Sequence, residues 1–497
     1  MVDTVNSLKP GARWLLPVLL TVQFLVSLDM SVVNVALPAI GTGLGFDAGA
    51  LAWVVNAYAL TFGGLLMLGG RLADVAGRRR VLVVGFVVFG LASLVGGLAQ
   101  APGQLVAARA VQGVGAALLS PVALALITVN FPAGAARSRA LGLWGAAGAA
   151  GGAVGVLAGG LLTDWFGWRA VMLVNVPVVV AVLAVVRPGV PADDRRASGS
   201  RPRLDALGAL LVTAGTSLLV LGLVRTETHG WTAWQTGGVL GAGVVLLAVF
   251  ALVETRVRQP LLRLGLLTRG PVLAANVFAL LMSAGQFAAF YFTSLYMQQV
   301  LGYGPTAAGS AFLPFCVGVV AGSVIAARTV GRVGAGVLLL VGGLLGAAGI
   351  AWFAMAVAVD GGFLLSVLGP SAVASVGIGM CFVPLGTAAT EGVAPEETGM
   401  ASGLLNSARQ VGGAVGLGVL VTVAASAGGD GAEGAEGLVD GYAAAYWVAA
   451  GLLAVAALAA GALHGVGARP AETPAGEKDS KNSGERVDPD VSRSTQG

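Results

Sequence analysis

Long apolar runs separated by short polar and charged segments dominate the chain. A helix needs about 20 apolar residues to cross roughly 30 Å of hydrocarbon, and about fourteen runs reach that length. We predict that they begin near Trp14, Ala50, Val81, Gly103, Ser138, Trp168, Leu204, Gln235, Gly270, Ala307, Val333, Gly362, Ser402 and Asp440. The pattern therefore predicts an all-α integral membrane protein with a bundle of about 14 transmembrane helices.

Composition also indicates a membrane protein. Of 497 residues, 56% are hydrophobic and 10% are charged, whereas a soluble globular protein carries roughly 25% charged residues. Inside a bilayer the 78 glycines let helix backbones approach closely. Cys316 and Cys381 lie in apolar segments, so neither a disulfide framework nor a thiolate metal site is expected. We expect no metal, no cofactor and no nucleic acid partner.

Basic residues concentrate in the N-terminal segment and in alternate loops, which hold 19 of the 28. These 19 are Lys9, Arg13, Arg71, Arg78, Arg79, Arg80, Arg137, Arg139, Arg187, Arg195, Arg196, Arg201, Arg203, Arg256, Arg258, Arg263, Arg269, Arg328 and Arg332. Because cytoplasmic loops carry an excess of Lys and Arg, we predict that both termini are cytoplasmic. The excess of Arg over Lys, with abundant Ala, Gly and Val, hints at a GC-rich bacterial genome and hence a bacterial cell (inner) membrane.

A weak internal repeat suggests how the spans are grouped. LADVAGRRRVLVVG (72–85) follows the second span and ARTVGRVGAGVLLLVG (327–342) follows the tenth, which aligns Gly77 with Gly331 and Arg78 with Arg332. Chance similarity in a chain rich in Gly, Val and Arg is the alternative. The repeat predicts two six-helix halves around an inserted pair. The expected division is an N-terminal segment (1–13), a first bundle (14–190), a linker with helices seven and eight (191–269), a second bundle (270–464) and a disordered cytoplasmic tail (465–497).

Asp29 lies inside the first predicted span, in LVSLDMSVVNVALP (25–38), with no basic residue within a dozen positions. An ionised carboxylate at a span centre costs about 2.5 kcal/mol or more. Arg109 lies in the fourth span, in LVAARAVQGVGAALLSP (105–121). A rise of about 1.5 Å per residue places both residues at similar depth. They are therefore candidate partners.

Proton coupling is the functional interpretation of this pair. The proton occupancy of a carboxyl group depends on its burial and on nearby positive charge, so a movement that changes the surroundings of Asp29 would load or release a proton. Two structural alternatives stay open. Asp29 could pair only with polar neighbours such as Ser31, Asn34 or Gln23, and Arg109 could only donate to backbone carbonyl groups.

Polar and aromatic side chains inside the spans are candidates for lining a substrate cavity. They are Asn34, Gln112, Tyr291, Tyr296 and Gln298. The last three lie in GQFAAFYFTSLYMQQ (285–299), in the ninth span. Aromatic stripes also form packing contacts and lipid-interface belts, so packing is the alternative for these residues and for Trp53, Asn56 and Tyr58 of the second span.

A gate is predicted at GRLADVAGRRR (70–80), which places Asp74, Gly77 and Arg78 in a tight turn between the second and third spans. A carboxylate at this turn could pair with arginine or cap a neighbouring helix, and such contacts break when two halves separate. The alternative is that the arginines only signal topology, and this is the favoured interpretation for Arg79 and Arg80.

Two further groups are candidates for gating. Arg409, in NSARQVGG (406–413), is equally compatible with a gate and with a scaffold role, and it could extend toward the cytoplasm. Gly155, Gly159 and Gly160 belong to a run of glycines in the fifth span that predicts a flexible, closely packed helix.

Several of these motifs together resemble the fourteen-span drug:proton antiporter branch of the major facilitator superfamily. The matching stretches are LDMSVVNVALPAI (28–40), GRLADVAGRRR (70–80), RAVQGVGAA (109–117), WRAVMLVNVP (168–177), LYMQQVLGYGPTAAGSAFLP (295–314) and GIGMCFVPLGTAATEGVAPEETGMASGLLNSARQVGGAVG (377–416). They occur in the expected order over nearly the whole chain. One departure is Val156, which stands where such exporters usually carry a proline in the fifth span.

The resemblance implies a proton-coupled antiporter that exports amphipathic organic compounds by rocking two bundles about a central cavity. Its partners would be a small organic substrate, protons and the lipid bilayer, and we expect a monomer. A dedicated exporter of one natural product or siderophore is the alternative within the same fold. A non-transporting sensor or a polytopic membrane enzyme belongs to another class. The enzyme is disfavoured because the sequence has no His-containing catalytic constellation and no phosphate-binding loop.

Overall fold

The computed structural model of the chain describes residues 14–132, 135–190, 205–229, 233–257, 260–394, 397–428 and 434–467. The predicted N-terminal segment (1–13), linker residues 191–204 and the predicted tail from residue 468 lie outside the described residues. Within these ranges the chain is helical and contains no strand.

Fourteen helical spans are long and apolar enough to cross a membrane. Their helices are α1 (Leu15–Leu44), α3 (Trp53–Ala76), α4 (Arg78–Gly97), α5 (Pro102–Asn130), α6 (Ala135–Phe166), α7 (Arg169–Leu173) with α8 (Asn175–Gly189), α9 (Ala206–His229), α10 (Trp234–Arg256), α11 (Gly270–Leu295) with η3 (Tyr296–Val300), α12 (Pro305–Ala311) with α13 (Leu313–Val333), α14 (Ala335–Ala356), η4 (Leu364–Leu368) with α15 (Gly369–Ala389), α16 (Thr398–Ala427) and α17 (Ala435–Gly467). Two short helices, α2 (Ala48–Leu51) and η2 (Leu264–Leu266), lie between spans. Each span begins within a few residues of its predicted start, so the predicted bundle of 14 helices is confirmed.

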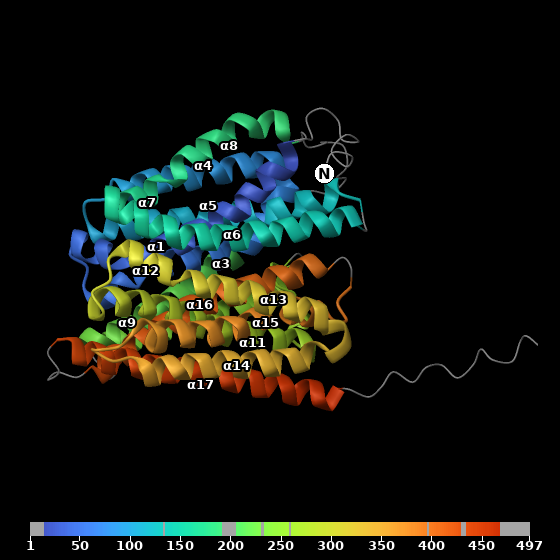
Figure 1. Cartoon of the computed structure of the whole chain (residues 1–497). Coiled ribbons are helices and arrows are strands. Elements are labelled where there is room, and N and C mark those ends of the chain that lie inside the picture. The colour runs from blue at the N-terminus through green and yellow to red at the C-terminus, as the bar shows by residue number, and fades with distance from the viewer. Residues whose placement is uncertain are drawn as a thin grey trace, which may run out of the picture.

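The helices form an N-terminal half (α1–α8) and a C-terminal half (α11–α17), shown in blue to green and in yellow to red (Figure 1). In the N-terminal half α1 packs along α6, and α5 contacts α3 and α4. In the C-terminal half α15 contacts α13 and α14, and α11 contacts α16 and α17. The inserted helices α9 and α10 pack on each other, and α9 also contacts α3 and α16. The domain boundaries at residues 190 and 269 stay a prediction.

The two halves share a glycine turn at the same place in their helix order. Gly77 joins α3 to α4 with a φ of 98°, and Gly334 joins α13 to α14 with a φ of 86°. Both values lie in the left-handed region that favours glycine. Gly331 lies inside α13, so the predicted alignment of Gly77 with Gly331 is wrong and Gly334 is the counterpart.

Glycines set the distance between α1 and α6. A Cβ at Gly155 would lie 2.7 Å from Leu28 O, and a Cβ at Gly159 would lie 2.8 Å from Val32 O. The two backbones approach this closely because these positions carry no side chain. The contact holds α1 with Asp29 in the interior of the N-terminal half, where its exposed fraction is 0%.

The two ends of the bundle differ in charge. We name the end at which α1 begins the basic end, because the turn at Arg78–Arg80 and the turn after Arg332 lie there. The end at which α1 finishes is named the far end. Both the start of α1 and the end of α17 lie at the basic end (Figure 1).

Hydrogen bonds join the N-terminal and C-terminal halves toward the far end of the bundle. Ser294 Oγ of α11 donates to Asn34 O of α1 over 2.8 Å. Gln298 Nε2 of η3 donates to Val35 O over 2.9 Å. Both acceptors are main-chain carbonyl groups, so these bonds fix the position of α1 whatever its side chains are.

Two more hydrogen bonds cross between the halves. Thr306 N, at the start of α12, donates to Asp164 Oδ2 near the end of α6 over 2.9 Å. Nearer the middle, Ser407 Oγ of α16 donates to Gly63 O of α3 over 2.7 Å. Toward the basic end of α6, a Cβ at Gly145 would meet nothing within 4 Å. Contact between α6 and the C-terminal half is thus made at its far end.

Candidate functional site

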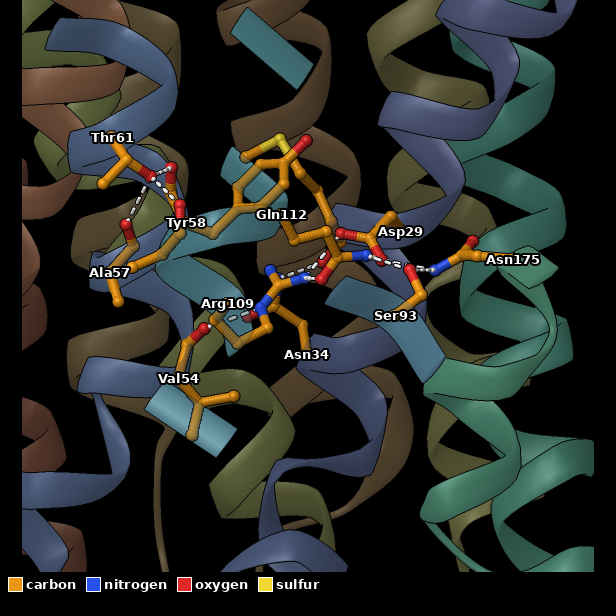
Figure 2. A network of polar contacts seen from close by, with 12 residues as sticks. Asp29, Asn34, Val54, Ala57, Tyr58, Thr61, Ser93, Arg109, Gln112 and Asn175 are labelled. Carbon is orange, nitrogen blue, oxygen red and sulfur yellow. Dashed lines mark hydrogen bonds and ion pairs between the residues drawn. The ribbon is translucent and has the colours of Figure 1, made fainter. Parts of the chain in front are cut away.

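Asp29 and Arg109 form an ion pair in the core of the N-terminal half (Figure 2). Arg109 Nη1 of α5 lies 2.6 Å from Asp29 Oδ2 of α1. The two residues are 1% and 0% exposed. A lone charge in such surroundings would be very costly, so each residue compensates the other. The predicted pairing is therefore present in the structure.

The second oxygen of Asp29 is held by two amides. Gln112 Nε2 of α5 and Asn175 Nδ2 of α8 each donate to Asp29 Oδ1 over 2.7 Å. Gln112 Nε2 also donates to Ser93 Oγ of α4 over 2.8 Å, and Gln112 Oε1 accepts from Arg109 Nη1 over 2.8 Å. Side chains from four spans therefore meet around one carboxylate, as Figure 2 shows.

Arg109 is also anchored to α3. Its Nε donates to Val54 O over 3.0 Å, and its guanidinium carbon lies 4.4 Å from the centre of the Tyr58 ring. A cation over an aromatic face is attracted by the ring electrons. Arg109 therefore makes both predicted contacts. It donates to a backbone carbonyl group, as the structural alternative expected, and it also pairs with Asp29, as the functional interpretation expected.

Small residues on α5 bring these groups together. A Cβ at Gly113 would lie 2.5 Å from Tyr58 O of α3, and a Cβ at Gly115 would lie 2.7 Å from Phe89 N of α4. Thr61 Oγ1 of α3 donates to the carbonyl oxygen of Ala110 over 2.8 Å. Because α5 is in backbone contact with α3 and α4, its long polar side chains reach partners on both helices and on α1.

Sequence reasoning missed two members of this network, Ser93 and Asn175, both 0% exposed. Asn175 is the first residue of α8, after the break in the helix at Val174. The available signal was a single amide inside the apolar motif WRAVMLVNVP and a single hydroxyl inside α4. Two of the polar neighbours considered as alternatives bond elsewhere: Gln23 Nε2 donates to Ser27 Oγ over 3.5 Å, and Asn34 Nδ2 donates to Met30 O over 2.7 Å.

The five predicted cavity residues lie in different places. Gln112 belongs to the Asp29 network. Asn34 Nδ2 donates to Met30 O of its own helix over 2.7 Å, while its main chain joins the halves. Gln298 also joins the halves. Their role in binding substrate stays a prediction.

The two predicted cavity tyrosines pack inside the C-terminal half. Tyr291 is 2% exposed and meets the Phe292 ring edge-on at 5.3 Å. Tyr296 is 1% exposed, and its hydroxyl donates to Ala358 O over 2.9 Å. These contacts are those of the packing alternative. Their substrate role likewise stays a prediction.

The predicted gating residues divide between contacts inside a half and contacts across the halves. Gly155 and Gly159 face α1, whereas a Cβ at Gly160 would lie 2.5 Å from Pro305 O of α12. The Gly77 turn precedes Arg78, the first residue of α4. The side chain of Asp74 lies outside the described part of the structure, so the predicted latch stays a prediction.

Arg409 lies in α16 with its guanidinium carbon 4.7 Å from the centre of the Phe382 ring of α15. Its Nε is buried and has no hydrogen-bond partner among the described residues. The side chain thus stacks on an aromatic ring, which differs from the predicted extension toward water. Its choice between gate and scaffold is open to test.

The Asp29 carboxylate is the common acceptor of this network. It accepts three N–H donors, one of them charged. Over the described ranges, no group of three or more His, Cys, Asp or Glu side chains that could hold a metal is found.

Comparison with known proteins gives one family. A family model described as Major Facilitator Superfamily matches residues 19–417. The chain is 44% identical over 408 residues to the cephamycin export protein CmcT of Amycolatopsis lactamdurans, covering 82% of this chain and 84% of the relative. It is 42% identical over 464 residues to the puromycin resistance protein pur8 of Streptomyces alboniger, covering 91% of each.

Another relative and one solved structure extend this picture. The tetracenomycin C resistance and export protein of Streptomyces glaucescens is 34% identical over 427 residues, covering 84% of this chain and 77% of the relative. A crystal structure of a bacterial homologue of the human lysosomal transporter Spinster, inward-facing and unoccupied, matches with a TM-score of 0.63 at 16% identity. The match covers 91% of this chain and 98% of that one, and it concerns the fold.

Proposed function

This chain belongs to the Major Facilitator Superfamily, and we propose that it exports antibiotics or similar amphipathic organic compounds in exchange for protons. It is a multi-pass membrane transporter and not an enzyme. In such transporters two bundles rock about a central site, which opens to one side of the membrane at a time. The proposal assigns the proton to the N-terminal half and the substrate to the space between the halves.

The buried pair of Asp29 and Arg109 is the observation that carries the proton step. A proton on Asp29 would remove the negative charge that Arg109 Nη1 contacts at 2.6 Å. The guanidinium would keep its bonds to Val54 O and Gln112 Oε1, but its charge would no longer be compensated. This change disfavours the present packing of α1 against α5, and it therefore couples protonation to a movement of α1.

Movement of α1 would be felt at the contact between the halves. Asn34 O and Val35 O follow Asp29 by less than two helical turns, and both accept hydrogen bonds from the C-terminal half. We propose that loading a proton on Asp29 loosens these two hydrogen bonds and opens the far end. Binding of substrate to the state with an open far end then restores the two hydrogen bonds. Gly160, packed on α12, belongs to the same contact.

Orientation completes the proposal. We propose that the basic end and both termini lie in the cytoplasm of a bacterial cell, and the arginines of this end support this, because cytoplasmic loops carry an excess of Lys and Arg. With the halves joined at the far end, the arrangement corresponds to a state that faces the cytoplasm. The predicted gate at Asp74, Gly77 and Arg78 would then close the cytoplasmic side in the alternate state. A monomer is sufficient for this cycle.

The names of three relatives support an antibiotic as substrate, since they refer to cephamycin, puromycin and tetracenomycin C. The C-terminal half offers an aromatic cluster suited to an amphipathic compound. Phe290 stacks on Phe312 at 5.1 Å and meets Phe315 edge-on at 4.7 Å. Such faces contribute binding without demanding one particular substrate.

A dedicated exporter of one compound is the second candidate. It is favoured by the 44% identity to a relative named for export of a single antibiotic class. Cells expressing the protein should be challenged with a panel of unrelated antibiotics. Protection against many supports broad export, and protection against one supports the dedicated exporter.

The test of proton coupling is transport of radiolabelled puromycin or a cephamycin into inverted membrane vesicles with an imposed proton gradient. Wild type should accumulate the compound, and collapse of the gradient should stop it. Asp29→Asn should reduce gradient-driven accumulation by at least about tenfold, because an amide does not ionise and so cannot bind and release the coupling proton. Asp47→Asn, the same substitution at an exposed site after α1, is the matched control and should transport normally. Unchanged accumulation by Asp29→Asn would overturn the proposal.

A further inference from the structure

Two carboxyl groups meet at the basic end of the inserted helices, far along the chain from Asp29. Asp205 precedes α9, and its Oδ1 accepts a hydrogen bond from Gly208 N over 2.8 Å, as at a helix N-cap. Glu254 lies near the end of α10, and its Oε2 accepts from Leu262 N over 3.1 Å. Asp205 is 5% exposed and Glu254 is 4% exposed.

The remaining oxygen of each carboxyl group lies beside Gly208. Asp205 Oδ2 and Glu254 Oε1 each lie 2.7 Å from the point where a Cβ on Gly208 would stand, so the two oxygens are no more than twice that distance apart. Both oxygens are buried, and neither receives a hydrogen bond from any described residue. Two acceptors placed this way repel unless a proton lies between them.

Arg71 of α3 brings a positive charge near this pair from a neighbouring helix. Its guanidinium donates a hydrogen bond to Pro260 O, beside the pair. Two ionised carboxylates side by side in a buried place would repel each other, and a proton on one of them removes that repulsion.

The pair is covered by residues 260–269, named here the cover segment. Leu262 is 5% exposed and packs with Phe250 of α10 and Leu404 of α16. Besides its bonds to Glu254 and Arg71, the cover segment reaches the C-terminal half: Arg263 Nη1 lies 2.6 Å from an oxygen of Glu397. It thus contacts α3, α10 and α16 at once.

We propose that Asp205 and Glu254 form a proton-binding site separate from Asp29, in which one proton shared by Oδ2 and Oε1 keeps the cover segment docked. When the proton leaves to solvent at the basic end, two adjacent carboxylates repel, and Glu254 no longer holds Leu262 N in place. Release of the cover segment loosens the connection between α3 and α16. The inserted helices then sense pH on the side of the membrane where the basic end lies.

Hydrogen–deuterium exchange of the purified full chain in lipid nanodiscs tests this site, and it does so without any transport measurement. Exchange of the amides in the cover segment is followed from about pH 5 to about pH 9 and corrected for the intrinsic pH dependence of exchange. In wild type, protection should fall by about tenfold or more as pH rises. Glu254→Gln supplies an N–H in place of the shared proton, so its cover segment should stay protected at every pH.

Two further variants separate the proton site from general loosening. Glu397→Gln removes the ion pair between Arg263 of the cover segment and the C-terminal half, so it should lower protection while the pH dependence persists. Asp205→Asn should behave as Glu254→Gln does, and it carries the test if Glu254→Gln fails to fold. The proposal is overturned if wild type shows no pH dependence, or if Glu254→Gln and Asp205→Asn both keep the pH dependence of wild type. These results do not depend on whether Asp29 couples transport.

Discussion

The cores of the two halves are built from different chemistry. In the N-terminal half, Asp29 and Arg109 form an ion pair whose polar atoms are bonded to neighbouring helices. In the C-terminal half, Arg409 faces the Phe382 ring, and Tyr446 stacks on Phe353 at 5.2 Å. The first core depends on mutual compensation of charge. In the second, an aromatic ring faces Arg409, and no ion pair of Arg409 with a carboxylate is found within the described ranges.

This difference matters because the halves share a fold plan. Gly77 and Gly334 make the same turn in corresponding places, so the backbone layout alone does not decide what each half does. A buried ion pair that is bonded to neighbouring helices is a poor site for a large organic substrate. An aromatic face has the opposite property. We infer that division of labour between the halves lies in the side chains.

Breaking the ion pair should have the largest effect. Arg109→Met leaves Asp29 buried without its counter-charge, which costs about 3–5 kcal/mol. The thermal unfolding temperature of the purified protein should fall sharply. Adding Asp29→Asn to this variant should restore most of the stability, because the unpaired charge is removed. Equal stability of wild type and Arg109→Met would contradict the compensation argument.

Removing one amide from the network should have an intermediate effect. Asn175→Ala deletes one of the two donors to Asp29 Oδ1 and should destabilise the protein by about 1–3 kcal/mol. Asn56→Ala is the matched control. Asn56 is 0% exposed, but its side-chain amide has no hydrogen-bond partner among the described residues, so its loss should cost less. Chemical denaturation in detergent compares the two, and a greater loss for Asn56→Ala would refute the assignment.

Changing the cation of the C-terminal half should act mainly on substrate binding. Arg409→Gln removes a cation–π contact, which is worth about 0.5–1 kcal/mol at exposed sites and about 2 kcal/mol when desolvated. Since Arg409 Nε has no acceptor in the described structure, an anionic group of a substrate could bind it. We expect KM to rise by about tenfold or more for an anionic cephamycin, because a hydrogen bond to a charged group is worth about 1.5–3 kcal/mol. The KM of cationic puromycin should not rise. An equal rise in KM for both compounds would show that Arg409 does not bind the anionic group of the substrate.

The smallest effect is expected where the halves touch. Gln298→Ala removes one neutral hydrogen bond to Val35 O, worth about 0.5–1.5 kcal/mol. The population open at the far end should increase by a few-fold. Spin-label distances between the far ends of α1 and α11 would measure this shift. Gln299→Ala, which removes a bond from Tyr442 within the C-terminal half, should leave that distance distribution unchanged.

Features set by a span's length or charge could be predicted from the sequence. Fourteen helices follow from fourteen apolar runs, and the Asp29–Arg109 contact follows because two buried opposite charges at one depth must compensate each other. Amides were harder to assign. Asn34 satisfies its side chain on Met30 O of its own helix, whereas Asn175 reaches across to α1. An amide in an apolar run has both options, and only packing selects between them.

Glycines posed the same difficulty. Gly155 and Gly159 face α1, while the adjacent Gly160 faces α12 across the halves. One residue step turns a helix position by about 100°, so neighbours with the same composition serve different interfaces. The repeat alignment failed for a related reason. Letters near Gly331 match those near Gly77, but only the backbone identifies Gly334 as the turn.

The N-terminal and C-terminal halves meet along two seams, one between α3 and α16 and one between α6 and α12. The position of α9 makes these two seams differ. Thr422 Oγ1 of α16 donates to Leu223 O of α9 over 3.1 Å, and Thr213 of α9 packs on Gly64 of α3, so α9 lies across one seam. In the described ranges no inserted helix makes substantial contact with α6 at the other seam. On one side, α9 therefore stands between the bilayer and the boundary of the two halves. On the other side, beside α6, a lipophilic molecule in the membrane reaches that boundary without passing an inserted helix.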